Sequence, residues 1–425
     1  MKEIKVIISV LLSICLIFVL VSCKSPGTDS ANNGASQEAE SVEITFIQTN
    51  GEFVALYQKI ADSFMAANSH VTIKVLDAPG DSYDQVMQSY FSSTPEEAPT
   101  IFVSSLSENY ILNDYRAVIS DSRAAGIMID SVRESVMKDG ELYGLPTTVQ
   151  GYGFVYNKSL FEEAGINTED LTTMEAFLSA CKKLQMLDGV SAAVGFGKET
   201  YFSFMHPVNY GIAINDDYIN LLNQVDNGEL TFNEIPSMKQ WITDVQELLP
   251  YTNHFEDYYD DLILKFSTGQ YAMILQGDWI QTSLDTNAPD FEYGMIPFPT
   301  NDNTSLAVDA ASMWSINKHA TKAQQKAAVE FLDWLYTSEE GQDFAANTLN
   351  FIPAYKDVKT PDSVLAKAVT EYANQDKTIP WAFTQHFPSG IEEDGSNLMQ
   401  QFVIGSLSMQ EFLTNLTDVW VKLAK

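Results

Sequence analysis

Aromatic side chains at the ends of apolar runs are the residues whose type and setting best suit a chemical task. Trp279 follows Gly277-Asp278 directly after an apolar run, and Tyr152, Tyr201 and Trp381 adjoin glycine, proline or polar residues. Sugars present flat C–H faces and equatorial hydroxyls, so a site for them combines an aromatic platform with amides and carboxylates. Most aromatic side chains fill cores instead. The pattern favours a ligand-facing Trp279 and leaves both interpretations open for Trp381.

Signatures of common enzyme classes are missing from the sequence. It contains no GxSxG, Walker A or HExxH motif and no GxGxxG that opens a βαβ unit. The five histidines show no metal-ligand spacing, and the acidic segments 257–261 and 301–303 lack the ligand ladder of a calcium loop. We therefore expect a protein that is not an enzyme and holds neither metal nor cofactor.

The stretch from Asp139 to Gly165 is the element that must position these residues. It predicts a strand that ends near Pro146, a turn at Gly151 and Gly153, a second strand and then a helix. Asn157 is a suitable N-cap for that helix, and Gly165 is a normal C-terminal signal. An ordinary joint in a core would have the same pattern.

The surrounding chain predicts an α/β fold. Strands at 42–47, 71–76 and 100–103 alternate with helices, which favours a mostly parallel sheet covered by helices. Further helices are expected at 173–187, 236–249, 323–336 and 411–423. A chain of 425 residues is too long for one core, so we expect two domains.

The charge excludes several partners. The formal net charge is -33, so the chain repels phosphate backbones and anionic lipid surfaces. Nucleic acid is therefore not an expected partner, and electrostatics would not hold the chain on a membrane.

Residues 1–22 predict a signal peptide. Its apolar run, Val6–Val21, is roughly 16 residues, shorter than the ~20 that a membrane-spanning helix needs. The run ends in LVSC at Cys23, which resembles a bacterial lipobox and implies cleavage before an acylated Cys23; a plain signal peptide is the alternative. Residues 23–41 are small and polar and read as a flexible tether. Only Cys181 remains beyond them, so no internal disulfide is expected.

Four runs in series carry a family resemblance. They are YGLP…YGFVYNKSLFEEAG in the central stretch, FSTGQYAMILQGDW at 266–279, YGMIPFP at 293–299 and AAVEFLDWLYTSEEGQDFAAN at 327–347. With the lipobox, the chain resembles the extracellular solute-binding proteins of ABC importers, the family that includes maltose-binding protein. The resemblance implies a two-lobed periplasmic-binding-protein-like fold, with each lobe a sheet flanked by helices and several crossings between them. The expected boundaries are 42–150 with 298–315 for the N-terminal lobe and 151–297 with 316–425 for the C-terminal lobe.

The same resemblance implies where a ligand would bind. Gln150 falls at a polar hinge position, Trp279 on a stacking platform, and Ser104 where maltose-binding protein has a tryptophan. With Tyr152 and Asp278 beside them, the expected contacts are Asn50, Glu52, Ser104, Gln150, Tyr152, Glu199, Tyr201, Asp278, Trp279, Asp309 and Trp381.

The implied mechanism is closure of two lobes over a sugar or oligosaccharide, followed by delivery to an ABC permease. The protein would be a monomer held outside the cytoplasm on the cell membrane by lipid on Cys23. Three alternatives stay open at this point: a binding protein for a polyamine or other cation, a lipid-anchored carbohydrate-active enzyme, and a ligand sensor.

Overall fold

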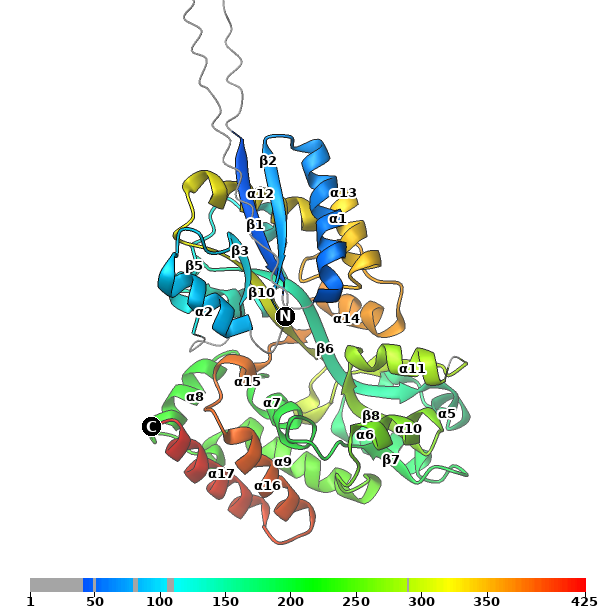
Figure 1. Ribbon diagram of the computed structural model, residues 1–425. Coiled ribbons are helices and arrows are strands. Elements are labelled where there is room, and N and C mark those ends of the chain that lie inside the picture. The colour runs from blue at the N-terminus through cyan, green and yellow to red at the C-terminus, as the bar shows by residue number, and fades with distance from the viewer. Residues whose placement is uncertain (1–40, 49–50, 79–82, 105–110, 289) are drawn as a thin grey trace, which may run out of the picture. The chain divides into compact units, whose positions relative to one another are not determined.

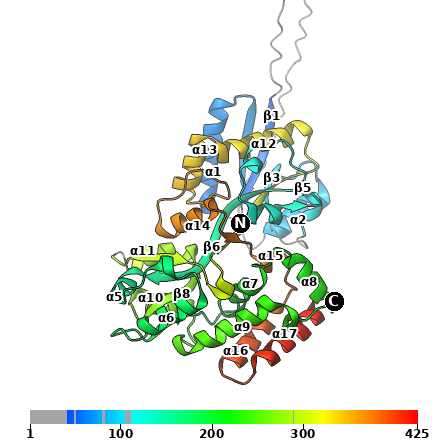
Figure 2. The same cartoon turned by 180° about the vertical axis from the view of Figure 1, so that it is seen from behind.

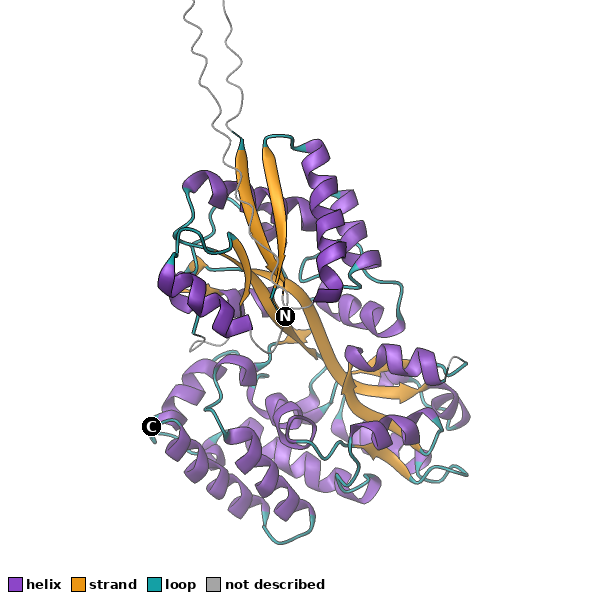
Figure 3. Ribbon diagram, in the orientation of Figure 1, coloured by secondary structure: helices purple, strands orange, loops and turns teal. Residues whose placement is uncertain are grey.

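One long strand, β6 (Leu145–Asn157), runs through the centre of the molecule and connects two lobes (Figure 1). The computed structural model describes residues 41–48, 51–78, 83–104, 111–288 and 290–425. The expected break of this stretch into strand, turn and strand was wrong, because β6 is continuous (Figure 3). The helix that follows, α5 (Lys158–Glu163), begins at the Asn157 cap, and Gly165 follows it at a positive φ of 62°, as expected.

The two glycines of β6 serve close packing rather than a turn. A Cβ on Gly151 would lie 2.6 Å from Cγ2 of Val369, and one on Gly153 would lie 2.3 Å from the carbonyl oxygen of Ile296. Only glycine therefore lets neighbouring elements approach this strand so closely. Pro146 is tolerated within β6 because the register of its partner strand is irregular between Ala310 and Met313.

Within the residues that the structure describes, the main sheet has nine strands and is mixed rather than mostly parallel. Its order is β2-β1-β3-β10-β6-β8-β7, with β9 beside β6 and β11 beside β10. Besides β6, these strands are β1 (Val42–Gln48), β2 (Val71–Asp77), β3 (Ile101–Ser104), β7 (Ala192–Gly195), β8 (Tyr271–Gly277), β9 (Tyr293–Ile296), β10 (Leu306–Ile316) and β11 (Thr378–Ile379). β1 pairs in parallel with β2 and β3, and β7 with β8, whereas β10 and β6 run antiparallel to their main neighbours.

The first lobe surrounds β1, β2 and β3. Its other elements are α1 (Gly51–Ala67), α2 (Tyr83–Ser93), α3 (Arg123–Gly126), α4 (Asp130–Val136), the hairpin of β4 (Met137–Lys138) and β5 (Glu141–Leu142), α12 (Lys322–Thr337) and α13 (Glu339–Asp343). Figure 2 shows α13 beside α1, where Ser63 Oγ donates a hydrogen bond to Glu340.

One domain assignment from the sequence was wrong. The segment 316–425 was expected in the C-terminal lobe, but α12 packs on β1, with the ring of Phe331 lying 6.0 Å from that of Phe46. An amphipathic helix must bury its apolar face, and α12 buries it against one face of β1. Further along the chain, α14 (Val364–Asn374) packs on β6, β9 and β10 at the crossing.

The second lobe is mainly helical around β7, β8 and β9. Its helices are α5, α6 (Met174–Leu184), α7 (His206–Ile212), α8 (Tyr218–Asp226), α9 (Pro236–Leu248), α10 (Tyr259–Ser267), α11 (Gln281–Asn287), α15 (Ala382–Gln385), α16 (Ile391–Val403) and α17 (Met409–Leu423). One core cluster contains Phe46, Val155 and Ile274 and therefore spans both lobes, while a second core cluster fills the second lobe around Phe204 and Trp241. Among the described residues, no helix has the length and apolarity needed to cross a membrane.

Candidate ligand-binding site

Among the described residues, six aromatic rings lie around His206, the first residue of α7. They come from β6, from the π-helical turn Tyr201–Met205, from the turn Asp278–Ile280 and from the chain around the start of α15. Ring centroids lie 4.2, 5.3, 5.5, 5.5, 6.1 and 6.1 Å from that of His206 for Tyr152, Phe202, Trp279, Phe383, Tyr201 and Trp381, respectively. We call these six rings and His206 the ring cluster.

The ring cluster grades from buried to exposed. Tyr152 is fully buried and His206 nearly so, whereas Phe202, Trp279, Trp381 and Phe383 are half-buried and Tyr201 is 50% exposed. The Tyr152 hydroxyl donates to the carbonyl of His206 at 3.0 Å, so it supports the cluster from beneath. The half-exposed rings are the ones whose apolar faces a solute can reach.

Trp279 is held in place at the end of β8. Its Nε1 donates to Oε1 of Gln276 at 2.8 Å. A Cβ on Gly277 would lie 2.1 Å from Cζ3 of the indole, so only glycine fits beneath this ring. The indole lies between Phe202, at 6.3 Å with an interplanar angle of 29°, and Trp381, at 6.3 Å and 88°. Trp279 is half-buried and packs against both core clusters, so its contact with a ligand stays a prediction.

Two carboxyls flank β6 next to the ring cluster. Asp278 Oδ1 accepts the backbone N–H of Gly151 at 2.7 Å. Asp309 is 1% exposed, with Oδ1 accepting the N–H of Ala310 at 2.7 Å and Oδ2 accepting that of Trp381 at 3.0 Å. Burial raises the pKa of both carboxyls to about 7. Asp309 therefore connects strand β10 to the backbone that carries Trp381.

His206 contributes no positive charge to the cluster. Burial lowers the pKa of its imidazole to about 3, so the ring is neutral at pH 7. The cluster thus joins a neutral imidazole, two carboxyls that titrate near neutral pH, and accessible ring faces. Such a surface suits a solute without a strong fixed charge.

Four buried polar atoms in or beside the ring cluster have no hydrogen-bond partner within the described part of the chain. They are Glu199 Oε2, His206 Nδ1, Gln276 Nε2 and Trp381 Nε1. The other oxygen of Glu199 accepts the N–H of Tyr259 at 2.8 Å, so one of the two carboxyl oxygens has a hydrogen-bond partner in the described part of the chain and the other has none. A buried polar atom without a partner costs about 1–3 kcal/mol, which a hydroxyl-bearing ligand would recover because a hydroxyl both donates and accepts.

The remaining ligand contacts predicted from the sequence either lie away from the ring cluster, lie at the crossing strands, or fall outside the residues that the structure describes. Ser104 is buried at the end of β3, where its hydroxyl hydrogen-bonds that of Ser315 at 2.8 Å. Gln150 pairs with Asp309 in the sheet and is half-buried. Asn50 lies outside the described residues, as does the side chain of Glu52 at the start of α1. The structure therefore brings Tyr152, Glu199, Tyr201, Asp278, Trp279, Asp309 and Trp381 together, and not Ser104.

Sequence reasoning missed three central residues. Phe202 and His206 lie in the apolar run YFSFMH, which looks like an ordinary core segment. Gln276 precedes Gly277 inside a strand that is otherwise apolar. The structure shows that its side chain is fully buried, at 0% exposure. A polar residue in an apolar strand next to a predicted platform is the sequence feature that would have found it.

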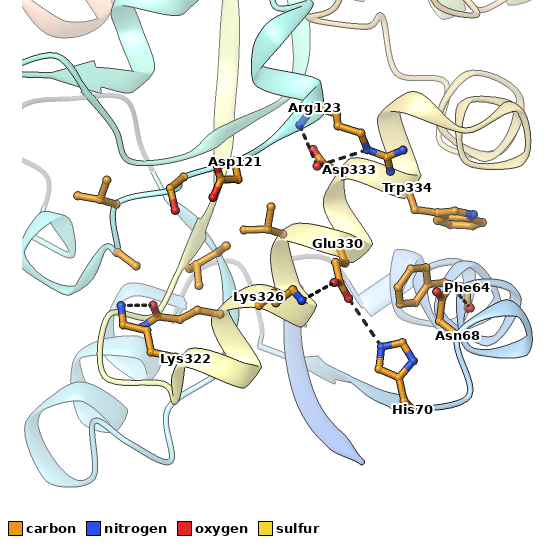
Figure 4. Close-up of a pocket in the computed structure, with 16 residues that line it drawn as sticks. Phe64, Asn68, His70, Asp121, Arg123, Lys322, Lys326, Glu330, Asp333 and Trp334 are labelled. Carbon is orange, nitrogen blue, oxygen red and sulfur yellow. Dashed lines mark hydrogen bonds and ion pairs between the residues drawn. The ribbon is translucent and has the colours of Figure 1, made fainter. Parts of the chain in front are cut away.

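A separate cavity of about 690 Å³ lies in the first lobe, between α1, the chain before α3, and α12 (Figure 4). Ion pairs cross its wall: Arg123 to Asp333 at 3.8 Å, Lys326 to Glu330 at 3.6 Å and His70 to Glu330 at 3.8 Å. It contains no residue of the ring cluster. We therefore take the ring cluster, and not this cavity, as the candidate site.

The fold and site together define a family of binding proteins. The chain belongs to the bacterial extracellular solute-binding proteins, whose family description matches residues 59–374. Members of this family bind solutes outside the cytoplasm and are not enzymes.

Named relatives are distant in sequence. A Brucella abortus (strain 2308) protein described only as a binding protein is 22% identical over 385 residues, which cover 87% of this chain and 90% of that protein. The maltodextrin-binding protein MdxE of Bacillus subtilis is 23% identical over 361 residues, covering 80% of this chain and 76% of its own. The apo form of RafE from Streptococcus pneumoniae superposes with a TM-score of 0.73 at 19% identity, covering 92% of this chain and all of that one, which supports the two-lobed fold.

Proposed function

We propose that this protein captures a neutral sugar or oligosaccharide on the ring cluster and delivers it to an ABC importer. The carrying observation is that the exposed ring of Tyr201 and the half-buried rings of Phe202, Trp279 and Trp381 occur together with buried polar atoms that lack partners among the described residues. Rings cover the apolar faces of a sugar, and Glu199, Gln276 and Trp381 hydrogen-bond its hydroxyls. Relatives named for maltodextrin and for arabinooligosaccharides support a saccharide ligand.

Closure of the lobes would complete this site. The crossing strands β6 and β10 carry Gln150 and Asp309, and a ligand that touches both lobes favours the closed form through its extra contacts there. Asp278 and Asp309 act in this proposal by orienting Gly151 and Trp381. The closed form is the one that a permease would recognise.

Calorimetry with a panel of neutral di- to pentasaccharides tests the proposal. We expect the wild-type protein to bind at least one, and Trp279→Ala to lower the affinity by at least about tenfold, or 1.4 kcal/mol, because it removes the central platform. Trp334→Ala is the matched control, since Trp334 is also a half-buried tryptophan but lies in the first lobe against Phe64. Full affinity in a folded Trp279→Ala variant would overturn the assignment of the site.

The cation-binding alternative rests on the net charge of -33. A thermal-unfolding assay with saccharides and polyamines tests it. Ligand binding raises thermal stability by mass action, so spermidine and putrescine are added beside the saccharides. A stabilisation by polyamines alone would replace the sugar assignment. Turnover of any glycan by the protein would instead support the alternative of a carbohydrate-active enzyme. Binding of the protein to a membrane kinase would support the alternative of a ligand sensor.

We also propose that lipid on Cys23 anchors a monomer to the cell membrane. The support is the LVSC sequence at the end of the apolar run, since acyl chains provide about 0.8 kcal/mol per buried CH₂. Cys23→Ala should move the protein from the membrane to the soluble fraction, whereas Cys181→Ala should not. Retention of the Cys23→Ala protein on membranes would contradict this anchor.

A further inference from the structure

The cavity of about 690 Å³ in the first lobe lies apart from the ring cluster. Its wall is formed by the end of α1, the chain before α3, and α12 (Figure 4), and we call it the first-lobe cavity. Ile316, the last residue of β10, lines it, whereas Asp309 of the same strand accepts the N–H of Trp381 in the ring cluster. The strand between Asp309 and Ile316 spans roughly 20 Å, so a small molecule in the cavity does not touch the rings.

Apolar side chains form part of the wall of the first-lobe cavity. Trp334 and Val329 of α12 are half-buried, and Val118 is 45% exposed. The ring of Trp334 lies 5.6 Å from that of Phe64 at an interplanar angle of 62°, so packing fixes its orientation. The volume lies within the range of about 300–1,000 Å³ that is typical of small-molecule sites. The cavity therefore offers apolar contact to a ligand of that size.

Cationic side chains line the same cavity, although the formal net charge of the chain is -33. Lys322 and Lys326 lie about one turn apart on α12, and Arg123 is the first residue of α3. The Arg123 side chain is 70% exposed, with Nε 3.8 Å from Asp333, so its terminal nitrogens are accessible to a ligand. Lys322 Nζ donates to the amide oxygen of Gln325 at 3.0 Å, a neutral acceptor that does not cancel its charge.

The carboxyls of the wall are engaged with other groups or screened by solvent. Asp333 is buried and accepts three hydrogen bonds at the start of α3. Glu330 lies 3.6 Å from Lys326 and 3.8 Å from His70. Asp121 is exposed, so solvent and salt weaken its effect on a bound anion. The donors of the guanidinium and of the ammonium without a carboxylate partner therefore remain for a ligand.

We propose that the first-lobe cavity binds a small amphipathic anion, a carboxylate on an aromatic or aliphatic body, at a site separate from the saccharide site. The apolar body packs on the Trp334 ring and the valine side chains, and the planar fork of Arg123 pairs with the two carboxylate oxygens. Lys322 and Lys326 add positive potential, since charges within about 10 Å act on one another at 0.1 M salt. This site does not depend on the proposed function, because none of its residues belongs to the ring cluster.

The test uses anilinonaphthalene sulfonate (ANS), an aromatic anion whose fluorescence rises in apolar surroundings. We expect the wild-type protein to bind ANS, and indoleacetate to displace it at a concentration at least about tenfold lower than indoleacetamide, which has the same shape and no charge. Arg123→Gln should lower the ANS affinity by about three- to tenfold, the effect of one lost charged hydrogen bond. Lys359→Gln is the control, because Lys359 is an exposed cation outside the cavity and its loss should leave the affinity unchanged.

Val118→Glu provides a second variant that the fold tolerates, because Val118 is an exposed residue of the wall. The new carboxylate repels the anion, so the ANS affinity should fall by at least about tenfold, while saccharide affinity stays unchanged. Ile404→Glu is the matched control, since Ile404 is 76% exposed at the end of a second-lobe helix.

Unchanged ANS affinity in both Arg123→Gln and Val118→Glu, or equal displacement by indoleacetate and indoleacetamide, would overturn this site. Loss of ANS binding in Trp279→Ala with full binding in Val118→Glu would place the probe on the ring cluster and overturn it as well. Each of these results leaves the saccharide proposal standing, because saccharide affinity is measured separately.

Discussion

Asp309→Asn removes the buried carboxyl that connects β10 to Trp381, and it separates the effect of charge from the effect of hydrogen bonding. The pKa of Asp309 is about 7 in the folded protein, against about 3.9 in an unfolded chain. Because the folded value is higher, the folded protein binds more protons between about pH 4 and pH 7. The free energy of unfolding that this group contributes therefore falls as the pH rises through that window.

The size of the effect follows from the shift. About 3 pH units correspond to about 4 kcal/mol over the whole window, and more than half of this falls between pH 5 and pH 8. Asparagine does not titrate, but its single oxygen cannot accept from both Ala310 and Trp381, which costs about 1–3 kcal/mol at either pH. Relative to the wild type, the variant should therefore be about as stable or slightly less stable at pH 5, and more stable at pH 8.

Urea unfolding at pH 5 and pH 8 measures this difference directly, provided that the m-values agree. Asp62→Asn is the control for loss of one negative charge, because Asp62 is exposed on α1. Stability that falls between the two pH values by the same amount in the wild type and in Asp309→Asn would refute the reasoning. In that case the buried carboxyl would not change its charge state in this range.

Two further substitutions probe the geometry at single positions. Gly277→Ala places a Cβ 2.1 Å from the Trp279 indole, so it should displace the ring and lower saccharide affinity by about tenfold or more; unchanged tryptophan fluorescence and affinity would contradict this. Asp333→Ala removes the acceptor of the Ser122 hydroxyl and of the Arg123 and Ala124 N–H groups at the start of α3. It should cost about 1–3 kcal/mol in thermal or urea unfolding and leave ligand affinity unchanged, since this cap lies in the first lobe; a loss of binding would argue against that separation.

Local patterns predicted most of the elements of the fold. The N-cap at Asn157, the helix over 323–336 and the strand over 71–76 depend on neighbours in sequence, and the structure has all three. The continuity of β6 was missed because Gly151 and Gly153 look like turn residues, and their tight contacts with Val369 and Ile296 come from far along the chain. Tertiary packing overrode the local preference at that point.

Local sequence likewise indicated only some residues of the candidate site. Trp279 and Tyr201 stand out in sequence because polar residues or glycine adjoin them, and both lie in the ring cluster. His206 does not stand out, since a buried histidine in an apolar run is usually a core residue. The placement of α12 on β1 also had no sequence signal, because an amphipathic helix does not reveal which sheet it covers.

The unbroken course of β6 makes the two lobes inseparable as folding units. A cut of the chain near Gln150 would leave β10, in the C-terminal fragment, without the part of β6 that precedes the cut, and would leave β3, in the N-terminal fragment, without β10. Either half expressed alone should expose unpaired strand edges and aggregate. Exchange of one lobe between relatives would therefore require cutting and rejoining β6 and β10 together, in register.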